Sequence, residues 1–166
     1  MVHERFEFDM PGSPEVVFDA FHYHEWRSRW DSLVNATHVI GGAPCPYVGA
    51  ITENSGGGIL RGLAIRTEFI SFDRPRVAAA KMQGRSFPFD RWAASLKHHA
   101  AANGRSLMIY TYSFEAGPRG LRWFIEPLTK RIFDWQTRKR FERMRAFLAG
   151  HANEIVAWQQ SKDGGA

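Results

Sequence analysis

Residues 89–114 read FDRWAASLKHHAAANGRSLMIYTYSF, and they contain the clearest local structural signal in the chain. Asn103 and Gly104 lie between two β-rich runs, Phe89–His99 and Ser106–Phe114. An Asn-Gly pair between two such runs is a strong short-range signal of a β-hairpin, because both residues tolerate the positive φ that the tight turn requires. The sequence therefore predicts two antiparallel strands joined by a tight turn.

Upstream of this hairpin, short runs with strand character alternate with turn residues. The first strand, at residues 3–9, ends at a Pro-Gly pair. Ser13-Pro14-Glu15 then predicts a helix start, since serine caps, proline suits the first position and glutamate favours the positive end of the dipole. This helical region is expected to run to about Trp30, with a break near His24. Further strands are expected at residues 36–40, 48–53, 60–72 and 77–82, with a turn at Asp73-Arg74-Pro75.

From Pro118 onward the apolar period changes from two to three or four, which is typical of a long amphipathic helix. Pro127 is expected to kink this helix or to mark its first turn. The positions that carry the period are Phe124, Leu128, Ile132, Trp135, Phe141, Met144, Leu148, Ile155 and Trp158. Residues 1–160 are thus expected to form one domain, followed by a disordered tail at 161–166.

The composition is that of an ordinary folded chain. The 166 residues are 44% apolar and 23% charged, with a net charge of +5. The single cysteine, Cys45, excludes an internal disulfide framework and a cysteine-based zinc cluster. No signal peptide and no membrane-spanning stretch is visible, so a cytoplasmic location is expected. Six Trp, four Tyr and thirteen Phe give an aromatic share of 14%, which is high for a small domain.

The order of these elements resembles the helix-grip fold of the START and birch-pollen-allergen superfamily, also called SRPBCC or polyketide cyclase/dehydrase-like proteins. The resemblance covers residues 3–159. Four features carry it. The strand Arg5–Phe8 leads into Ser13-Pro14-Glu15-Val16-Val17-Phe18, and a tryptophan-centred segment, Arg29-Trp30-Asp31-Ser32-Leu33-Val34, ends the short helices. The other two features are the turn at Asp73-Arg74-Pro75 and the Asn-Gly hairpin before the last strand and the long helix. Asn103-Gly104-Arg105-Ser106 stands where many cyclase-like members have a Gly-Thr pair, so no subfamily is singled out.

The resemblance implies an α+β fold. A curved antiparallel sheet of about seven strands wraps around the long C-terminal helix, and two short helices follow the first strand. Between sheet and helix lies a hollow lined by apolar and aromatic side chains, in which small apolar molecules bind. In such a fold, aromatic side chains from the sheet and from the helices would line the same hollow.

Strand parity identifies the side chains that face such a hollow, and packing in a solid core is the alternative for each of them, favoured by residue type for Met82 and Trp92. In the last strand, Tyr110 and Tyr112 share a face with Met108 and Phe114. In the long middle strand, Leu63, Ile65, Thr67 and Phe69 form an apolar face, while Glu68 points outward. The candidate ligand-binding residues are Trp30, Ile65, Thr67, Phe69, Met82, Trp92, Tyr110, Tyr112, Phe124, Leu128 and Phe133.

Signals for other chemistry are absent from the sequence. His22 and His24 would lie on opposite sides of a helix, and His98 and His99 on opposite faces of a strand, so no metal site is expected. No nucleophile motif is present, and Gly56-Gly57-Gly58 lacks the Lys-Ser/Thr of a phosphate loop. No cofactor is expected.

The basic charge is concentrated between residues 130 and 145. Seven positive residues stand there against Asp134 and Glu142, and this net of +5 equals the charge of the whole chain. The stripe could attract an anionic membrane or RNA through Arg138, Lys139, Arg140, Arg143 and Arg145. The alternative is a solvated helix face with an Asp134–Arg138 pair.

Three functions are therefore consistent with the sequence. The leading hypothesis is binding of a small hydrophobic ligand such as a lipid, quinone, polyketide or aromatic metabolite. The second is a cyclase, aromatase or dehydrase reaction on a polyketide-like substrate, with Tyr110 or Tyr112 as proton donor. The third is association with the ribosome, RNA or an anionic membrane through the basic helix.

Overall fold

The hairpin predicted at residues 89–114 lies near one edge of a seven-stranded antiparallel sheet in the computed structural model, which describes residues 1–31, 34–56 and 64–163. The strand order is β1-β7-β6-β5-β4-β3-β2. The strands are β1 (Val2–Met10), β2 (Val34–Val39), β3 (Ile51–Gly56), β4 (Ala64–Asp73), β5 (Val77–Met82), β6 (Phe89–Ala100) and β7 (Ser106–Ala116). The helices are α1 (Pro14–His22), α2 (His24–Arg27) and α3 (Arg122–Asp163), with short 3-10 turns η2 (Ala102–Gly104) and η3 (Arg119–Leu121).

The β6–β7 hairpin has the geometry that its sequence predicts. Asn103 and Gly104 both adopt positive φ, of 57° and 68°. The two strands then pair over their whole length, from Phe89 opposite Ala116 to Ala100 opposite Ser106. Every second side chain of β7 is buried, as the period of two requires.

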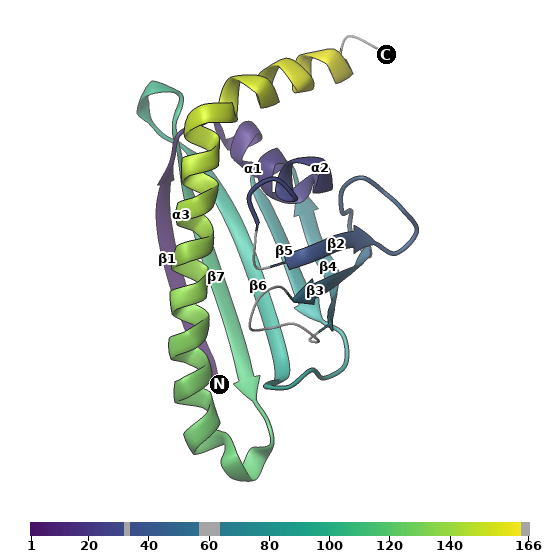
Figure 1. The fold of residues 1–166 in the computed structure, drawn as a ribbon, viewed down its shortest axis with the longest axis vertical. Coiled ribbons are helices and arrows are strands. Elements are labelled where there is room, and N and C mark those ends of the chain that lie inside the picture. Colours follow the sequence, from purple (N-terminus) through teal and green to yellow (C-terminus); the bar gives the residue numbers. More distant parts are fainter. Residues whose placement is uncertain (32–33, 57–63, 164–166) are drawn as a thin grey trace.

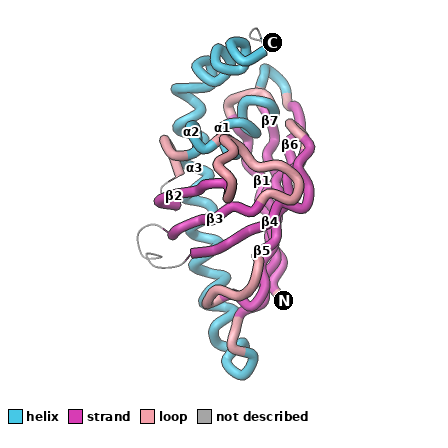
Figure 2. Tube along the Cα trace, turned by 90° about the vertical axis from the view of Figure 1, so that its right-hand side faces the viewer, coloured by secondary structure: helices cyan, strands magenta, loops and turns pink. Residues whose placement is uncertain are grey.

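The curved sheet and the long helix form two layers (Figure 1). Figure 2, turned by 90°, shows β1, β6 and β7 on one side of α3, β2 and β3 crossing it, and the two short helices beside its upper part. The predicted helix-grip architecture is therefore confirmed.

The helices begin and end where local chemistry dictates. The Ser13 hydroxyl accepts a hydrogen bond from the Val16 N–H at 3.4 Å and caps α1, whose first residue is Pro14. The predicted break lies at Tyr23, where extended backbone separates α1 from α2. Helix α3 begins five residues before Pro127 and continues to Asp163, so residues 161–163 are helical rather than part of a tail.

Residues 164–166, and the predicted strand positions 60–63 with Leu63, lie outside the described residues.

The C-terminal half of α3 packs against the sheet and α1. Phe141, Met144, Leu148 and Ile155 are fully buried there. The last turns cover α1 and α2, where the Trp158 ring meets Tyr23 and Trp26 at centroid distances of 4.7 and 5.7 Å. This half of the helix makes the solid part of the core.

One buried carboxylate ties three elements together beside this core. Asp19 of α1 accepts two hydrogen bonds of 2.7 Å from Arg74 in the β4–β5 turn. It accepts a third, of 2.6 Å, from Gln159 of α3. Asp19 therefore joins α1, the β4–β5 turn and the C-terminal half of α3 at this end of the molecule.

Two further observations concern membrane-spanning helices and metal-binding clusters. Within the described residues, no helix combines the length and the apolar character that a membrane crossing requires. In the same part of the chain, no three histidine, cysteine or acidic side chains are grouped to hold a metal ion.

Candidate ligand-binding cavity

A cavity of about 590 Å³ lies between the N-terminal half of α3 and the concave face of the sheet. Its sheet wall comes from β3, β4, β5, β6 and β7, and α1 and α2 contribute Phe21, His22 and Arg27. Pockets for small organic molecules typically measure 300–1,000 Å³. The cavity therefore has the size of a ligand site.

Small side chains on two neighbouring strands create part of this space. Ala78 and Ala80 of β5 and Ala94 of β6 all line the cavity, and Ala80 and Ala94 lie directly opposite each other in the sheet. Larger apolar side chains surround them, including Phe69, Trp92 and Phe133. The wall is thus mainly apolar, as expected for a site that holds an apolar molecule.

The mouth of the cavity is made of exposed apolar side chains. Phe124, Leu128 and Ile132 of α3 line it and are 61%, 52% and 48% exposed. Phe87, in the segment before β6, lines it from the other side and is 66% exposed. An apolar rim of this kind gives an apolar molecule a continuous path from the surface inward.

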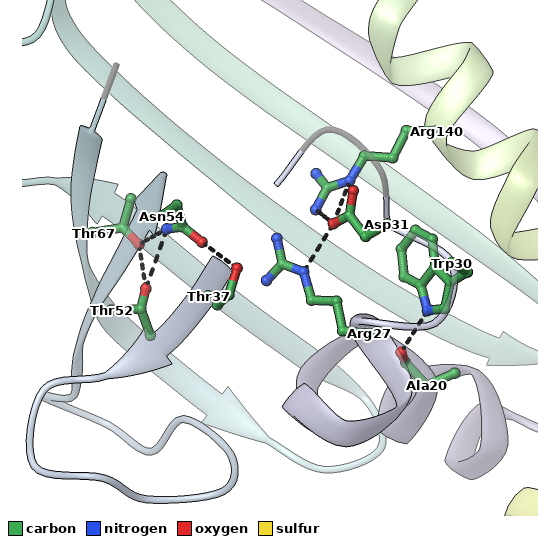
Figure 3. Close-up of polar contacts among 9 residues, drawn as sticks. All are labelled: Ala20, Arg27, Trp30, Asp31, Thr37, Thr52, Asn54, Thr67 and Arg140. Carbon is green, nitrogen blue, oxygen red and sulfur yellow. Dashed lines mark hydrogen bonds and ion pairs between the residues drawn. The ribbon is translucent and has the colours of Figure 1, made fainter. Parts of the chain in front are cut away.

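The cavity is not apolar at every point, because two arginines reach it from different elements. Arg27 at the end of α2 and Arg140 of α3 both line it and both bind Asp31. Arg27 donates from Nε to Asp31 Oδ2 at 2.9 Å, and Arg140 donates from Nε and Nη2 to the same oxygen at 3.1 and 2.5 Å. Figure 3 shows the two guanidinium groups converging on this carboxylate.

Burial and charge set the protonation of this trio. Burial alone would raise the pKa of the Asp31 carboxyl, but Arg140 and Arg27 together hold that pKa below its ordinary value. Burial, and then the neighbouring Arg140, lower the pKa of Arg27 to about 10, so Arg27 stays charged at neutral pH. Both arginines also stack on the Phe21 ring, with guanidinium carbons 4.7 and 4.9 Å from its centroid.

Hydroxyl and amide groups on β3 and β4 form a second polar group in the wall. The Thr52 and Thr67 hydroxyls are 2.7 Å apart, and both are buried. The Asn54 amide donates to them at 3.5 and 3.4 Å, and its carbonyl accepts from Thr37 at 2.9 Å. Thr52, Asn54 and Thr67 all line the cavity with Arg27.

Tyrosine and histidine provide the remaining titratable groups at this site. Tyr110 lines the cavity, and burial raises its pKa to about 12, so it stays protonated as a candidate proton donor must. His22 also lines the cavity, and burial lowers its pKa well below the usual value, so its ring is neutral. One of its nitrogens, Nδ1, is occupied by the Phe18 carbonyl at 2.8 Å.

The structure brings eight of the eleven candidate residues together at this cavity. They are Ile65, Thr67, Phe69, Trp92, Tyr110, Phe124, Leu128 and Phe133. Glu68 lies on the opposite face of β4, where it pairs with Lys81 at 3.3 Å, as parity predicts.

The other three candidates do not line the cavity. Trp30 is buried and donates from its indole nitrogen to the Ala20 carbonyl at 2.9 Å, which anchors the segment after α2 to α1. Met82 packs at the edge of the main core. Tyr112 stacks between Phe6 and Phe114 and donates its hydroxyl proton to Asp134 of α3. Its hydroxyl is therefore already engaged, and Tyr110 alone of the two tyrosines lines the cavity.

The basic stretch of α3 is divided between interior and surface. Arg140 points inward to Asp31, with a side chain only 14% exposed, so it does not belong to a surface stripe. Asp134 pairs with Lys130 at 2.7 Å instead of with Arg138, whose guanidinium lies over the Phe6 ring. Arg138, Lys139, Arg143 and Arg145 remain exposed.

Sequence reasoning did not assign Arg27, Arg140, Thr52 and Asn54 to the cavity, and it did not pair Asp31 with the two arginines. One local signal was available, because Arg27 and Asp31 stand at the i,i+4 spacing of an ion pair. No local signal marks Arg140, whose partner lies 109 residues away.

Comparisons with known proteins support the fold. No protein-family model and no curated protein sequence matches this chain. Among solved structures, protein XoxI from Bacillus cereus superposes with a TM-score of 0.68 at 15% identity, covering 89% of this chain and 96% of that chain. A conserved protein from Geobacillus kaustophilus superposes with a TM-score of 0.70 at 13% identity, covering 90% of this chain and 97% of that chain. Ara h 8.0201 superposes with a TM-score of 0.63 at 14% identity, covering 90% of this chain and 99% of that chain.

Proposed function

We propose that this helix-grip protein binds a small hydrophobic molecule, such as a lipid, quinone, polyketide or aromatic metabolite, in the cavity between sheet and helix. The observation that carries the proposal is the 590 Å³ cavity with its apolar wall and its exposed apolar mouth. An apolar molecule bound there would leave water at a gain of about 25 cal/mol for each Å² of its surface buried. The same burial would cover exposed rim residues such as Phe124 and Leu128.

Titration with the neutral fluorescent probe N-phenyl-1-naphthylamine tests the proposal. The matched pair is Ala94→Phe, which places a ring inside the cavity, and Ala93→Phe, which places the same ring on the opposite face of β6. We expect the unmodified protein and Ala93→Phe to bind the probe alike, and Ala94→Phe to bind it at least about tenfold more weakly, since filling the space displaces the probe. Equal binding by both variants, or no binding by the unmodified protein, would contradict the proposal.

A second candidate function is contact with an anionic membrane through the N-terminal half of α3. Trp123 and Trp135 are 77% and 55% exposed, and they lie on the same helix as the exposed Arg131 and Lys139. Aromatic side chains with nearby positive charge are suited to the interface of an anionic bilayer. The exposed aliphatic side chains Leu128 and Ile132 on the same helix can enter a bilayer but cannot stack on bases, so they favour a membrane over RNA.

Sedimentation with lipid vesicles tests this second function. We expect binding to phosphatidylserine-containing vesicles at low salt, weaker binding at high salt, and weaker binding by a Trp123→Ala, Trp135→Ala double variant. Tyr47→Ala, which changes an equally exposed ring in the loop before β3, serves as control. No sedimentation at low salt would rule this function out.

A further inference from the structure

The charged groups of the cavity do not balance. Two arginines, Arg27 and Arg140, line it, and both bind the single carboxylate of Asp31. His22, the other basic lining residue, is neutral because burial lowers its pKa well below the usual value. Within the described residues, the inner end of the cavity therefore carries one uncompensated positive charge.

Among the described residues, some N–H donors of both arginines have no hydrogen-bond partner. Arg27 binds Asp31 through Nε alone, and in the described part of the chain its two terminal nitrogens have no hydrogen-bond acceptor. Arg140 uses Nε and Nη2 on Asp31, which leaves Nη1. Figure 3 shows the Arg27 guanidinium on the side of Asp31 that faces the strands carrying Thr52, Asn54 and Thr67.

A buried guanidinium with unused donors is costly unless an anion or an acceptor reaches it. The planar fork of terminal N–H groups matches the two oxygens of a carboxylate. In the Thr52–Thr67 pair, on the facing strands, one hydroxyl proton is used within the pair and the other is available for such an anion. The remaining wall is mainly apolar and leads to the rim at Phe124 and Leu128.

We propose that the cavity takes an amphiphile with an ionised carboxylate, held at the inner end by Arg27 and Arg140, while its apolar chain runs toward the mouth. This inference rests on the proposed function and adds the head group and the orientation of the ligand. The carboxylate replaces water on the free arginine donors and balances the second positive charge. The apolar chain contacts the alanine and aromatic wall.

Competition against N-phenyl-1-naphthylamine, with ligands of one chain length, tests the head group directly. Decanoate, 1-decanol and decylamine are compared at pH 7.5, where a carboxyl group is ionised and a primary amine is charged. We expect decanoate to bind at least about tenfold more tightly than 1-decanol, because a charge-assisted hydrogen bond exceeds a neutral one by about that factor. Decylamine should bind most weakly, since its charge repels both arginines.

Each other outcome of this competition has a distinct meaning. If 1-decanol binds as tightly as decanoate, the head-group inference is overturned while the proposed function stands. If the probe binds but no decyl ligand displaces it, the inference is likewise overturned. If the probe itself does not bind, the proposed function fails together with the inference.

Arg27→Met gives an independent test of the residue, because it leaves Asp31 and Arg140 as a balanced pair. We expect this variant to lose most of the preference for decanoate over 1-decanol, because the carboxylate loses the two terminal nitrogens of Arg27 as donors. The matched control is Arg29→Met, two residues along the chain, where the arginine pairs with Glu154 on the surface and the preference should persist. A folded Arg27→Met protein that keeps the full preference would overturn the assignment, and if the variant fails to fold, the competition on the unmodified protein decides.

Discussion

Asp31 shows how one side chain can determine the stability of a whole region. It is 5% exposed and accepts hydrogen bonds from two arginines that belong to α2 and α3. Breaking a buried ion pair by removing one partner costs more than the pair itself contributes, because the remaining charges stay buried. Without the Asp31 carboxylate, the guanidinium charges of both Arg27 and Arg140 would stay largely buried with no negative partner.

We therefore predict that Asp31→Asn lowers the free energy of unfolding by about 3–5 kcal/mol, measured by urea denaturation at pH 7. The matched control is Asp9→Asn, because Asp9 forms a similar two-pronged pair with Arg105 but is exposed to solvent. That change should have little effect, since water and salt screen the pair. Equal small effects from both substitutions would show that the trio is not needed for folding.

His98 gives a prediction on pH. Burial lowers its pKa from 6.5 to about 4, with a smaller effect from the neighbouring His99, and neither ring nitrogen has a hydrogen-bond partner within the described residues. The unfolded chain takes up a proton near pH 6.5, whereas the folded protein does so only near pH 4. Stability is therefore full above pH 6.5 and falls as the pH drops from 6.5 to 4, by roughly 3 kcal/mol for this group.

Urea denaturation at pH 7 and at pH 4.5 measures this loss. His98→Leu should reduce the difference in unfolding free energy between the two pH values strongly, while His99→Leu, on the exposed face of β6, should reduce it only slightly. Some pH dependence should remain in both variants, because burial also lowers the pKa of His22. An unchanged difference in His98→Leu would contradict the assignment.

At the scale of elements, α3 has two halves with different roles. Its N-terminal half exposes apolar side chains around the mouth of the cavity, and its C-terminal half packs against the sheet, α1 and α2. Trp135 and Trp158 represent the two halves. Trp158 meets Tyr23 and Trp26, whereas Trp135 is 55% exposed.

We predict that Trp158→Ala lowers the free energy of unfolding by about 2–3 kcal/mol, because a half-buried ring leaves contacts on α1 and α2 unfilled. Trp135→Ala should change it by less than about 0.5 kcal/mol. Thermal unfolding followed by circular dichroism compares the two variants. If Trp135→Ala lowers the free energy of unfolding more than Trp158→Ala does, the proposed roles of the two halves of α3 are wrong.

Elements with a regular period were predictable, because their pattern is local. Alternation identified the inward face of β4 through Ile65, Thr67 and Phe69, and the Asn103-Gly104 turn defined the last hairpin. Arg140 was not predictable in the same way. On its helix it is one basic residue among several, and only a partner from a distant segment turns it inward.

At the scale of the whole molecule, the chain combines a solid core at one end with a hollow at the other. The fold itself follows from the order of strands and helices, so it could be predicted from the sequence. The hollow could not, because it depends on register. Ala80 and Ala94 become neighbours only once β5 and β6 are paired, and neither residue marks a cavity by itself.

The central claim is that an amphiphile enters between sheet and helix with its carboxylate at Arg27. Heteronuclear NMR of the labelled protein, titrated with decanoate, tests this claim most directly because it locates the ligand. The account predicts the largest shifts at the Arg27 side chain and at Thr52, Thr67 and Ala94, with smaller ones at the rim residues of α3. Shifts confined to exposed residues such as Trp123 and Trp135, with Arg27 and Ala94 unmoved, would contradict it.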